Sequence, residues 1–251
     1  MSRCPRLLFS SVLIVGLMGG AISAEAQQQQ PRTSPWVIDA GIGFDVSVNG
    51  NVNSGAIGTL QGQATAVLPN SYGDVYGTGV HLRFGGGYLL DEQSELRTFF
   101  TLQTADADLV RLGDIGPSSL YGQYSDYTTF SLDFGYRRYL PLRDARFRPY
   151  GEATIGVAFI DEINVLLAAP QSNIVFDDTD FYDRTAAFTL GIHVGVLFPV
   201  REQLGVNVQV GLRRVSGLAE VSGFAGTELE EMNSDSARLT FPVVVGVRYR
   251  F

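Results

Sequence analysis

The chain has 251 residues, of which 45% are hydrophobic and only 18% are charged, with 29 glycines and a formal net charge of −8. Its 18 basic residues are all arginines and form no basic cluster, which argues against a nucleic-acid partner. The single cysteine excludes a disulfide framework and a metal site built from cysteines.

The N-terminal segment has the pattern of a secretory signal peptide. Arg3 and Arg6 precede an apolar stretch that runs from Leu7 to Ile22, and Ala24 and Ala26 form an A-x-A cleavage site. The stretch is short and glycine-interrupted for a membrane anchor, which needs about 20 apolar residues. The predicted organisation is a signal peptide at 1–26, a polar leader at 27–35 and a folded domain at 36–251.

Eight later segments alternate apolar and polar residues with a period of two, which is typical of strands with two different faces. Their connections alternate between short turns and long loops. This arrangement indicates an all-β fold, an eight-stranded antiparallel up-and-down transmembrane β-barrel. The predicted strands are 36–48, 76–90, 95–105, 127–139, 147–159, 186–200, 203–213 and 236–251.

Three features predict that the apolar face points outward to lipid. The opposite face is rich in glycine, which suits a bore barely wide enough for side chains. It also carries charges of both signs, which can pair in an enclosed lumen. Aromatic residues stand near the strand ends of the apolar face, where bilayer girdles lie. We place Trp36, Tyr88, Tyr136, Phe147, Phe198 and Tyr249 in a girdle at the short-turn end, and Tyr76, Phe159 and Phe188 toward the other end.

The last strand carries a family resemblance. Val247, Tyr249 and Phe251 end a run with an apolar residue at every second position. This run resembles the C-terminal assembly signal of Gram-negative outer-membrane barrels. The segment Arg148-Pro149-Tyr150-Gly151-Glu152-Ala153 is similar to a stretch of small barrels of the OmpA transmembrane-domain, OmpX and opacity type. The resemblance implies an outer-membrane location, recognition by the barrel-assembly machinery, and surface roles such as adhesion or envelope integrity. Full-length OmpA has a peptidoglycan-binding domain that this pattern lacks, so we do not expect peptidoglycan tethering.

The lumen-facing charges form the candidate site. The strand register places Asp39 close to Arg248 and Arg250, because the first and last strands meet. Two interpretations stay open, an ion-pair plug that fills the bore or a gate whose pairs exchange partners to admit small solutes. The set is Asp39, Arg83, Arg97, Asp133, Glu152, His193, Arg213, Arg238, Arg248 and Arg250.

The sequence predicts no enzyme, cofactor or metal site. His81 and His193 face inward, and neither begins a zinc-binding motif. Ser131 also faces inward, two residues before Asp133, and no histidine is near it in the sequence, so a lipid hydrolase is the third interpretation of function. The acidic run at 176–183 offers carboxylates to a divalent cation but lacks the glycine and final glutamate of a calcium loop.

We therefore expect an outer-membrane barrel, exported by a cleaved signal peptide, with a structural or surface-interaction role carried by its long outer loops. A small passive pore for ions or small solutes is the alternative. The expected partners are outer-membrane lipid and lipopolysaccharide, together with the barrel-assembly machinery and periplasmic chaperones. The first long loop, 49–75, is uncharged until Asp74 and suits either a flexible tip or an adaptable contact surface.

Overall fold

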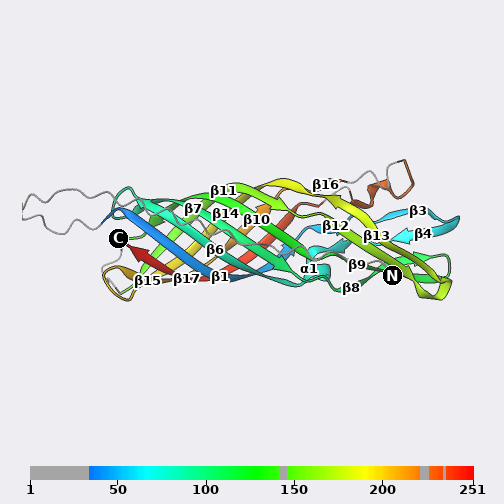
Figure 1. Cartoon of the computed structure of the whole chain (residues 1–251), viewed down its shortest axis with the longest axis horizontal. Helices are drawn as coiled ribbons and strands as arrows, with labels where there is room; N and C mark the ends of the chain where they lie inside the picture. Colours follow the sequence, from blue (N-terminus) through cyan, green and yellow to red (C-terminus); the bar gives the residue numbers. More distant parts are fainter. Residues whose placement is uncertain (1–33, 142–145, 221–225, 234–235) are drawn as a thin grey trace, which may run out of the picture. The chain divides into compact units, whose positions relative to one another are not determined.

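The computed structural model describes residues 34–141, 146–220, 226–233 and 236–251, with the backbone alone at 177–178. The predicted signal peptide and its cleavage site at Ala24 and Ala26 lie outside the described residues. Eight antiparallel strands close into a barrel (Figure 1). They are β1 (Trp36–Asn49), β6 (Thr78–Leu89), β7 (Ser94–Ala105), β10 (Tyr127–Tyr139), β11 (Arg148–Ile160), β14 (Thr185–Pro199), β15 (Leu204–Val215) and β17 (Arg238–Arg250).

The structure confirms the predicted fold, and each strand end lies within two residues of its predicted place. The last strand pairs with the first, so no barrel edge is left open to hydrocarbon. A row of paired residues that starts at Arg214 on β15 passes round the wall and returns to β15 at Leu204, ten residues earlier. For eight strands, this stagger corresponds to a strand tilt of about 40°.

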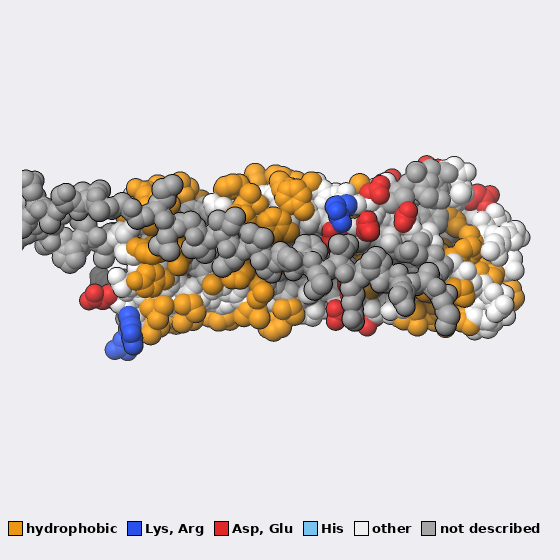
Figure 2. Space-filling model, viewed as in Figure 1, with side chains coloured by type: hydrophobic (Ala, Val, Ile, Leu, Met, Phe, Trp, Pro, Cys, Tyr) orange, Lys and Arg blue, Asp and Glu red, His pale blue; other side chains and the backbone are white. Residues whose placement is uncertain are grey.

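The outer wall of the barrel is apolar. Ile42, Phe84 and Ile192, on three different strands, are all about half exposed. Hydrophobic side chains cover the surface over the barrel strands. Acidic side chains gather beyond this belt, toward the end of the molecule formed by the long loops (Figure 2). Except for Tyr76, the predicted girdle residues are exposed, and Trp36 packs edge-on against Tyr88 with 4.9 Å between ring centroids.

Tyr76 was wrongly assigned to the outer girdle. It ends the short helix α1 (Tyr72–Tyr76) and is only 2% exposed, inside the molecule. Ser71 accepts a hydrogen bond from the Asp74 amide while the Asp74 carboxylate accepts one from the Ser71 amide. This capping box starts a helix in the predicted loop, and the helix includes Tyr76, the first residue of the predicted strand. Within the described ranges no helix is long and apolar enough to cross a membrane.

The long loops are ordered rather than irregular. They contribute a seven-stranded sheet in the order β16-β13-β12-β9-β8-β4-β3, in which neighbouring loops pair with each other. A small β2–β5 pair belongs to the first loop. The elements are β2 (Asn51–Asn53), β3 (Ala56–Leu60), β4 (Gln63–Val67), β5 (Asn70–Ser71), β8 (Leu109–Ile115), β9 (Ser118–Tyr124), β12 (Ile163–Ala169), η1 (Pro170–Ser172), β13 (Ile174–Asp183), β16 (Ala219–Glu220) and η3 (Glu230–Asn233).

The four loops form a ring, which we call the cap. The fourth loop meets the first, where the Ser54 amide donates to the Met232 carbonyl at 2.8 Å and the Glu228 and Leu229 side chains lie against Gly58. The inner face of the cap is a continuous apolar core that covers the outer mouth of the barrel. Its aromatic members are Tyr72, Tyr76, Tyr124, Tyr127, Phe181 and Tyr182, and its aliphatic members include Ile160, Ile163, Leu112, Ile115 and Met232.

The apolar face therefore changes sides along the chain. In β11 the inward residues run from Glu152 and Thr154 to Ala158 and Ile160, while the outward residues are apolar. Past the exposed pair at 161–162, the inward residues of β12 are all apolar. In lipid the wall buries its polar side, and in water it buries its apolar side, because the hydrophobic effect acts only where water is present.

We predict that the cap depends on its own core and unfolds separately from the barrel. Replacing Leu167, which is 5% exposed, by Asp places a charge in that core. Limited proteolysis of the cap should accelerate on the order of tenfold or more, while the barrel keeps its heat-dependent shift in gel mobility.

The control is Leu109→Asp, at a cap position that is 63% exposed. Equal proteolysis rates for the two variants would contradict an apolar cap core.

Candidate functional site

The barrel lumen is the candidate site, and Glu152 lies at its centre. The carboxylate is fully buried and contacts three arginines from three other strands. Arg97 Nη1 and Arg137 Nε approach Oε2 at 2.7 and 2.8 Å, and Arg83 Nη2 approaches Oε1 at 3.2 Å. The Gln209 amide also donates to Oε1, at 3.2 Å. A buried carboxylate with this many charge-assisted partners is fully compensated.

Arg97 links three carboxylates in the half of the lumen nearer the short turns. Its guanidinium contacts Glu152 at 2.7 Å, Asp39 at 2.8 Å and Glu95 at 3.4 Å. Arg83 and Arg97 both stack on the buried ring of Phe99, with Cζ 3.5 and 4.2 Å from the ring centroid. The planar, multiply donating guanidinium suits this role, which the single ammonium of a lysine would fill poorly.

Glu95 and Tyr139 tie the last strand to this network. Arg248 on β17 donates to the Glu95 carboxylate and to the Tyr139 hydroxyl, both at 2.8 Å, and Tyr139 donates to Glu95 at 2.9 Å. Gly87 makes room for the Glu95 carboxylate, because a Cβ at that position would collide with Oε1.

A second cluster lies toward the cap and is centred on Asp133. The carboxylate accepts hydrogen bonds from Thr189 at 2.6 Å and from Ser131 at 3.0 Å, and it pairs with Arg213 at 3.3 Å. Among the described residues, the Ser131 hydroxyl donates to Asp133 and makes no hydrogen bond to a histidine.

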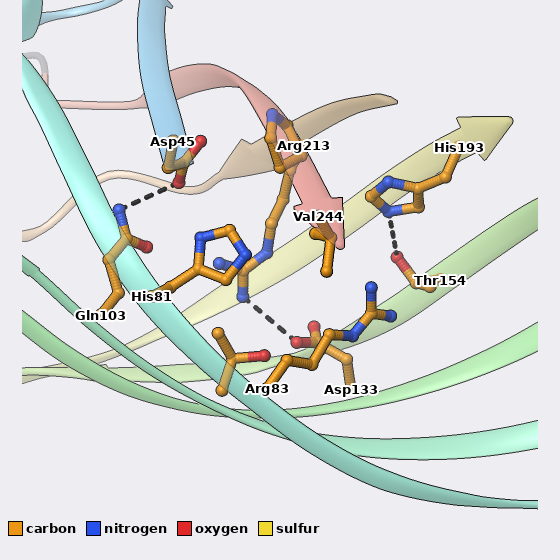
Figure 3. Close-up of a pocket in the computed structure, with 11 residues that line it drawn as sticks. Asp45, His81, Arg83, Gln103, Asp133, Thr154, His193, Arg213 and Val244 are labelled. Atoms are coloured by element: carbon orange, nitrogen blue, oxygen red, sulfur yellow. Dashed lines mark hydrogen bonds and ion pairs between the residues drawn. The ribbon is translucent and has the colours of Figure 1, made fainter. Parts of the chain in front are cut away.

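The two histidines face one cavity from opposite walls (Figure 3). His81 is on β6 and His193 on β14, four places apart in the eight-strand order. His193 Nε2 lies 3.4 Å from the Thr154 hydroxyl, and on the other side Asp45 accepts from Gln103 at 2.9 Å. The cavity measures about 30 Å³, which holds about two waters.

A second cavity of about 10 Å³ lies beside Asp39 and Arg97. Arg83 and Val244 line both cavities, so the Arg83 side chain lies between them. Each of these two cavities has room for only one or two waters.

The outer mouth is closed by the cap. Arg238 lies beneath it, 2% exposed, and donates to the Ser47 hydroxyl at 2.9 Å. Its guanidinium stacks on Tyr127 and Tyr72, at 4.4 and 5.3 Å from the ring centroids. Burial raises the pKa of the Tyr72 hydroxyl well above its ordinary value, so this ring stays neutral. Solute entry from the cap side would have to displace this aromatic layer.

Most of the predicted site residues come together, with three qualifications. Asp39 does face Arg248 across the strand pair, but its ion-pair partner is Arg97. Arg238 and Arg250 lie outside the network: Arg238 is beneath the cap, and Arg250 donates to the Ser34 carbonyl at the barrel end. Glu95 and Arg137 belong to the network, and the predicted set does not include them.

The described residues gather no metal ligands. No group of three or more His, Cys, Asp or Glu side chains lies within reach of a common ion there. The Asp177 and Asp178 side chains, in the acidic run at 176–183, lie outside the description.

Comparison with solved structures finds barrels of the outer membrane. The outer membrane protein OprG from Pseudomonas aeruginosa is similar with a TM-score of 0.50 and 11% identity, over 87% of this chain and 97% of that one. Neisserial surface protein A matches at 0.45 and 12%, over 87% and 99% of the two chains. The outer membrane protease OmpT from Escherichia coli matches at 0.42 and 11%, over 90% and 100%. At such identities the likeness shows the fold alone. No family model and no curated protein matches the chain.

We predict that Glu152→Gln destabilises the barrel by about 3–5 kcal/mol, because it leaves three buried arginines without their shared carboxylate. Urea unfolding from lipid vesicles measures the change.

Glu162→Gln removes the same charge from an exposed position outside the lumen and serves as the matched control. A free energy of unfolding for Glu152→Gln that equals the control value would refute a central role for Glu152.

Proposed function

We propose that this chain is an outer-membrane protein without enzymatic activity, whose barrel anchors a rigid cap that binds a positively charged partner outside the cell. The observation that carries the proposal is the cap itself. All four long loops fold into one sheet over a shared apolar core. Loops that only connect strands have no need of such a core, whereas a binding surface benefits from being held in shape before the partner arrives.

The charge of the cap indicates the kind of partner. The described cap residues include two arginines, Arg111 and Arg184, and both are paired with aspartates. Such a surface attracts cations and repels polyanions. The acidic residues are Asp74, Asp106, Asp108, Asp114, Asp126, Asp161, Glu162, Asp180, Asp183, Glu220, Glu228, Glu230 and Glu231.

In this proposal the lumen charges form a plug. The two small cavities and the aromatic layer under the cap support a filled bore over a pore. The plug holds the wall rigid beneath the cap. We also keep Val247, Tyr249 and Phe251 as the proposed assembly signal, read by the barrel-assembly machinery, with periplasmic chaperones delivering the chain.

The cap is predicted to bind a cationic probe through its acidic surface. Asp180, Asp183 and Glu220 lie on paired segments of β13 and β16 and are exposed. Changing all three to their amides should weaken binding of a deca-lysine peptide by about tenfold at low salt, and added salt should reduce the difference. Titration of the peptide onto the detergent-solubilised chain measures it.

Amides at Asp91, Glu92 and Glu202 remove the same charge from the short turns at the opposite end and form the control. If both triple variants lose binding equally, net charge rather than the cap attracts the probe.

For the plug, a planar-bilayer recording of the folded chain should show no reproducible conductance steps. Steady steps that change in size with Arg213→Ala would instead identify the lumen as a pore, since Arg213 lines the larger cavity.

A further inference from the structure

A groove on the outer wall of the barrel lies where the wall meets the cap. It measures about 320 Å³ and is lined by Asn49, Gly50, Arg214, Ala237, Arg238 and Leu239. Leu239 pairs with Asn49 on one side and with Arg214 on the other, so the groove crosses the start of β17 between β1 and β15. A bulge in the β1–β17 pairing between Ser47 and Asn49 shifts the register at this point.

The position of the groove across the membrane follows from the strand register. Leu204 pairs with Tyr249 of the girdle at the short-turn end, and Arg214 is ten residues further along the same strand. At the tilt of this barrel, ten residues rise by roughly 25 Å. The apolar band of such barrels is also about 25 Å tall. Arg214 therefore stands at the far edge of the band, at the level of lipid headgroups.

The groove offers hydrogen-bond donors without acceptors. Arg214 is exposed and has no ion-pair or hydrogen-bond partner among the described residues. Asn49 uses its Oδ1 to accept from the Gly50 amide at 2.8 Å, which leaves its amide nitrogen free to donate. Arg238 also contributes to the groove wall, but its guanidinium is buried on the inner side beneath the cap, where no carboxylate lies within 4.0 Å in the described structure, so its charge is not neutralised there. These donors match the oxygens of a phosphate.

The groove carries an unpaired positive charge, which distinguishes it from the rest of the boundary between barrel and cap. Arg184, the other exposed arginine near this level, is paired with Asp161 at 3.3 Å. The remaining described charges at the ends of the long loops are carboxylates, such as Asp106, Asp126 and Asp183. An anionic headgroup is therefore repelled around most of the rim and attracted in the sector that contains Arg214.

We propose that this groove binds the phosphate-bearing headgroup of a membrane lipid in the leaflet next to the cap. Arg214 and Asn49 hold the phosphate oxygens, and the unneutralised charge of Arg238 strengthens the attraction. The site rests on the proposed function only for the side of the membrane on which the cap lies. It would fasten lipid to the wall beneath a cap that otherwise repels anions.

The test measures lipid selectivity of the folded chain in phosphatidylcholine vesicles. Electron spin resonance of spin-labelled phosphatidic acid gives its association constant relative to spin-labelled phosphatidylcholine. A single lipid-facing arginine should give a selectivity of about fivefold. Arg214→Ala should reduce the ratio to near one, and Arg214→Lys should retain most of it. Leu239→Trp, which fills the groove but keeps the charge, should also reduce it.

Arg184→Ala is the matched control, because it removes the same charge from an arginine that already has a partner. An equal loss of phosphatidic acid selectivity in Arg184→Ala and Arg214→Ala would overturn the proposed site. Unchanged selectivity in Arg214→Ala would also overturn it. Competition by millimolar inorganic phosphate would show a free-phosphate site and overturn the lipid assignment. A heat-dependent gel shift verifies folding of each variant. The peptide titration and the bilayer recording contain no phosphatidic acid. A failure of the proposed function in those experiments is therefore distinguishable from a failure of the lipid site.

Discussion

The medium around the wall decides which face of every strand is apolar, and the rest of the structure depends on this constraint. Along the eight barrel strands the outward side chains meet hydrocarbon, so the polar side chains have to be inside. Beyond the exposed pair Asp161 and Glu162, both faces of the loop strands border water. The apolar side chains there are buried, as in a water-soluble protein. The membrane barrel and the water-soluble cap are thus one continuous wall with opposite interiors.

The polar interior creates the need for the ion-pair network. A charge in this narrow lumen has little water, so Asp39, Glu95 and Glu152 are held by arginines, and Arg97 alone contacts all three. The polar side chains of the lumen fit because glycines face several of them from the wall: a Cβ at Gly156 would collide with Asp133, and one at Gly43 with His81.

Much of this was predictable from the sequence, since a period of two identifies strands and their faces directly. The partners were less so. Glu95 meets Arg248 across the two intervening strands because of the barrel stagger, which is not visible in an alternation pattern. Arg137, by contrast, is the direct cross-strand partner of Glu152 on β10 and β11. Tyr76 was misplaced because a four-residue capping box overrode the apparent strand. The cap was missed as an ordered unit because its strands are short and its apolar face has the opposite orientation.

The ion pair between Glu95 and Arg248 has a consequence for the order in which the chain assembles. Its two residues are 153 positions apart, and Arg248 belongs to the strand that is synthesised last. Before β17 pairs, β1 and β15 have unpaired edges that face lipid. Glu95 then lacks its ion pair with Arg248, and the rings of Tyr72 and Tyr127 lack their contact with Arg238. The pairing of β17 with its two neighbours supplies all of these contacts together, which favours cooperative closure of the barrel.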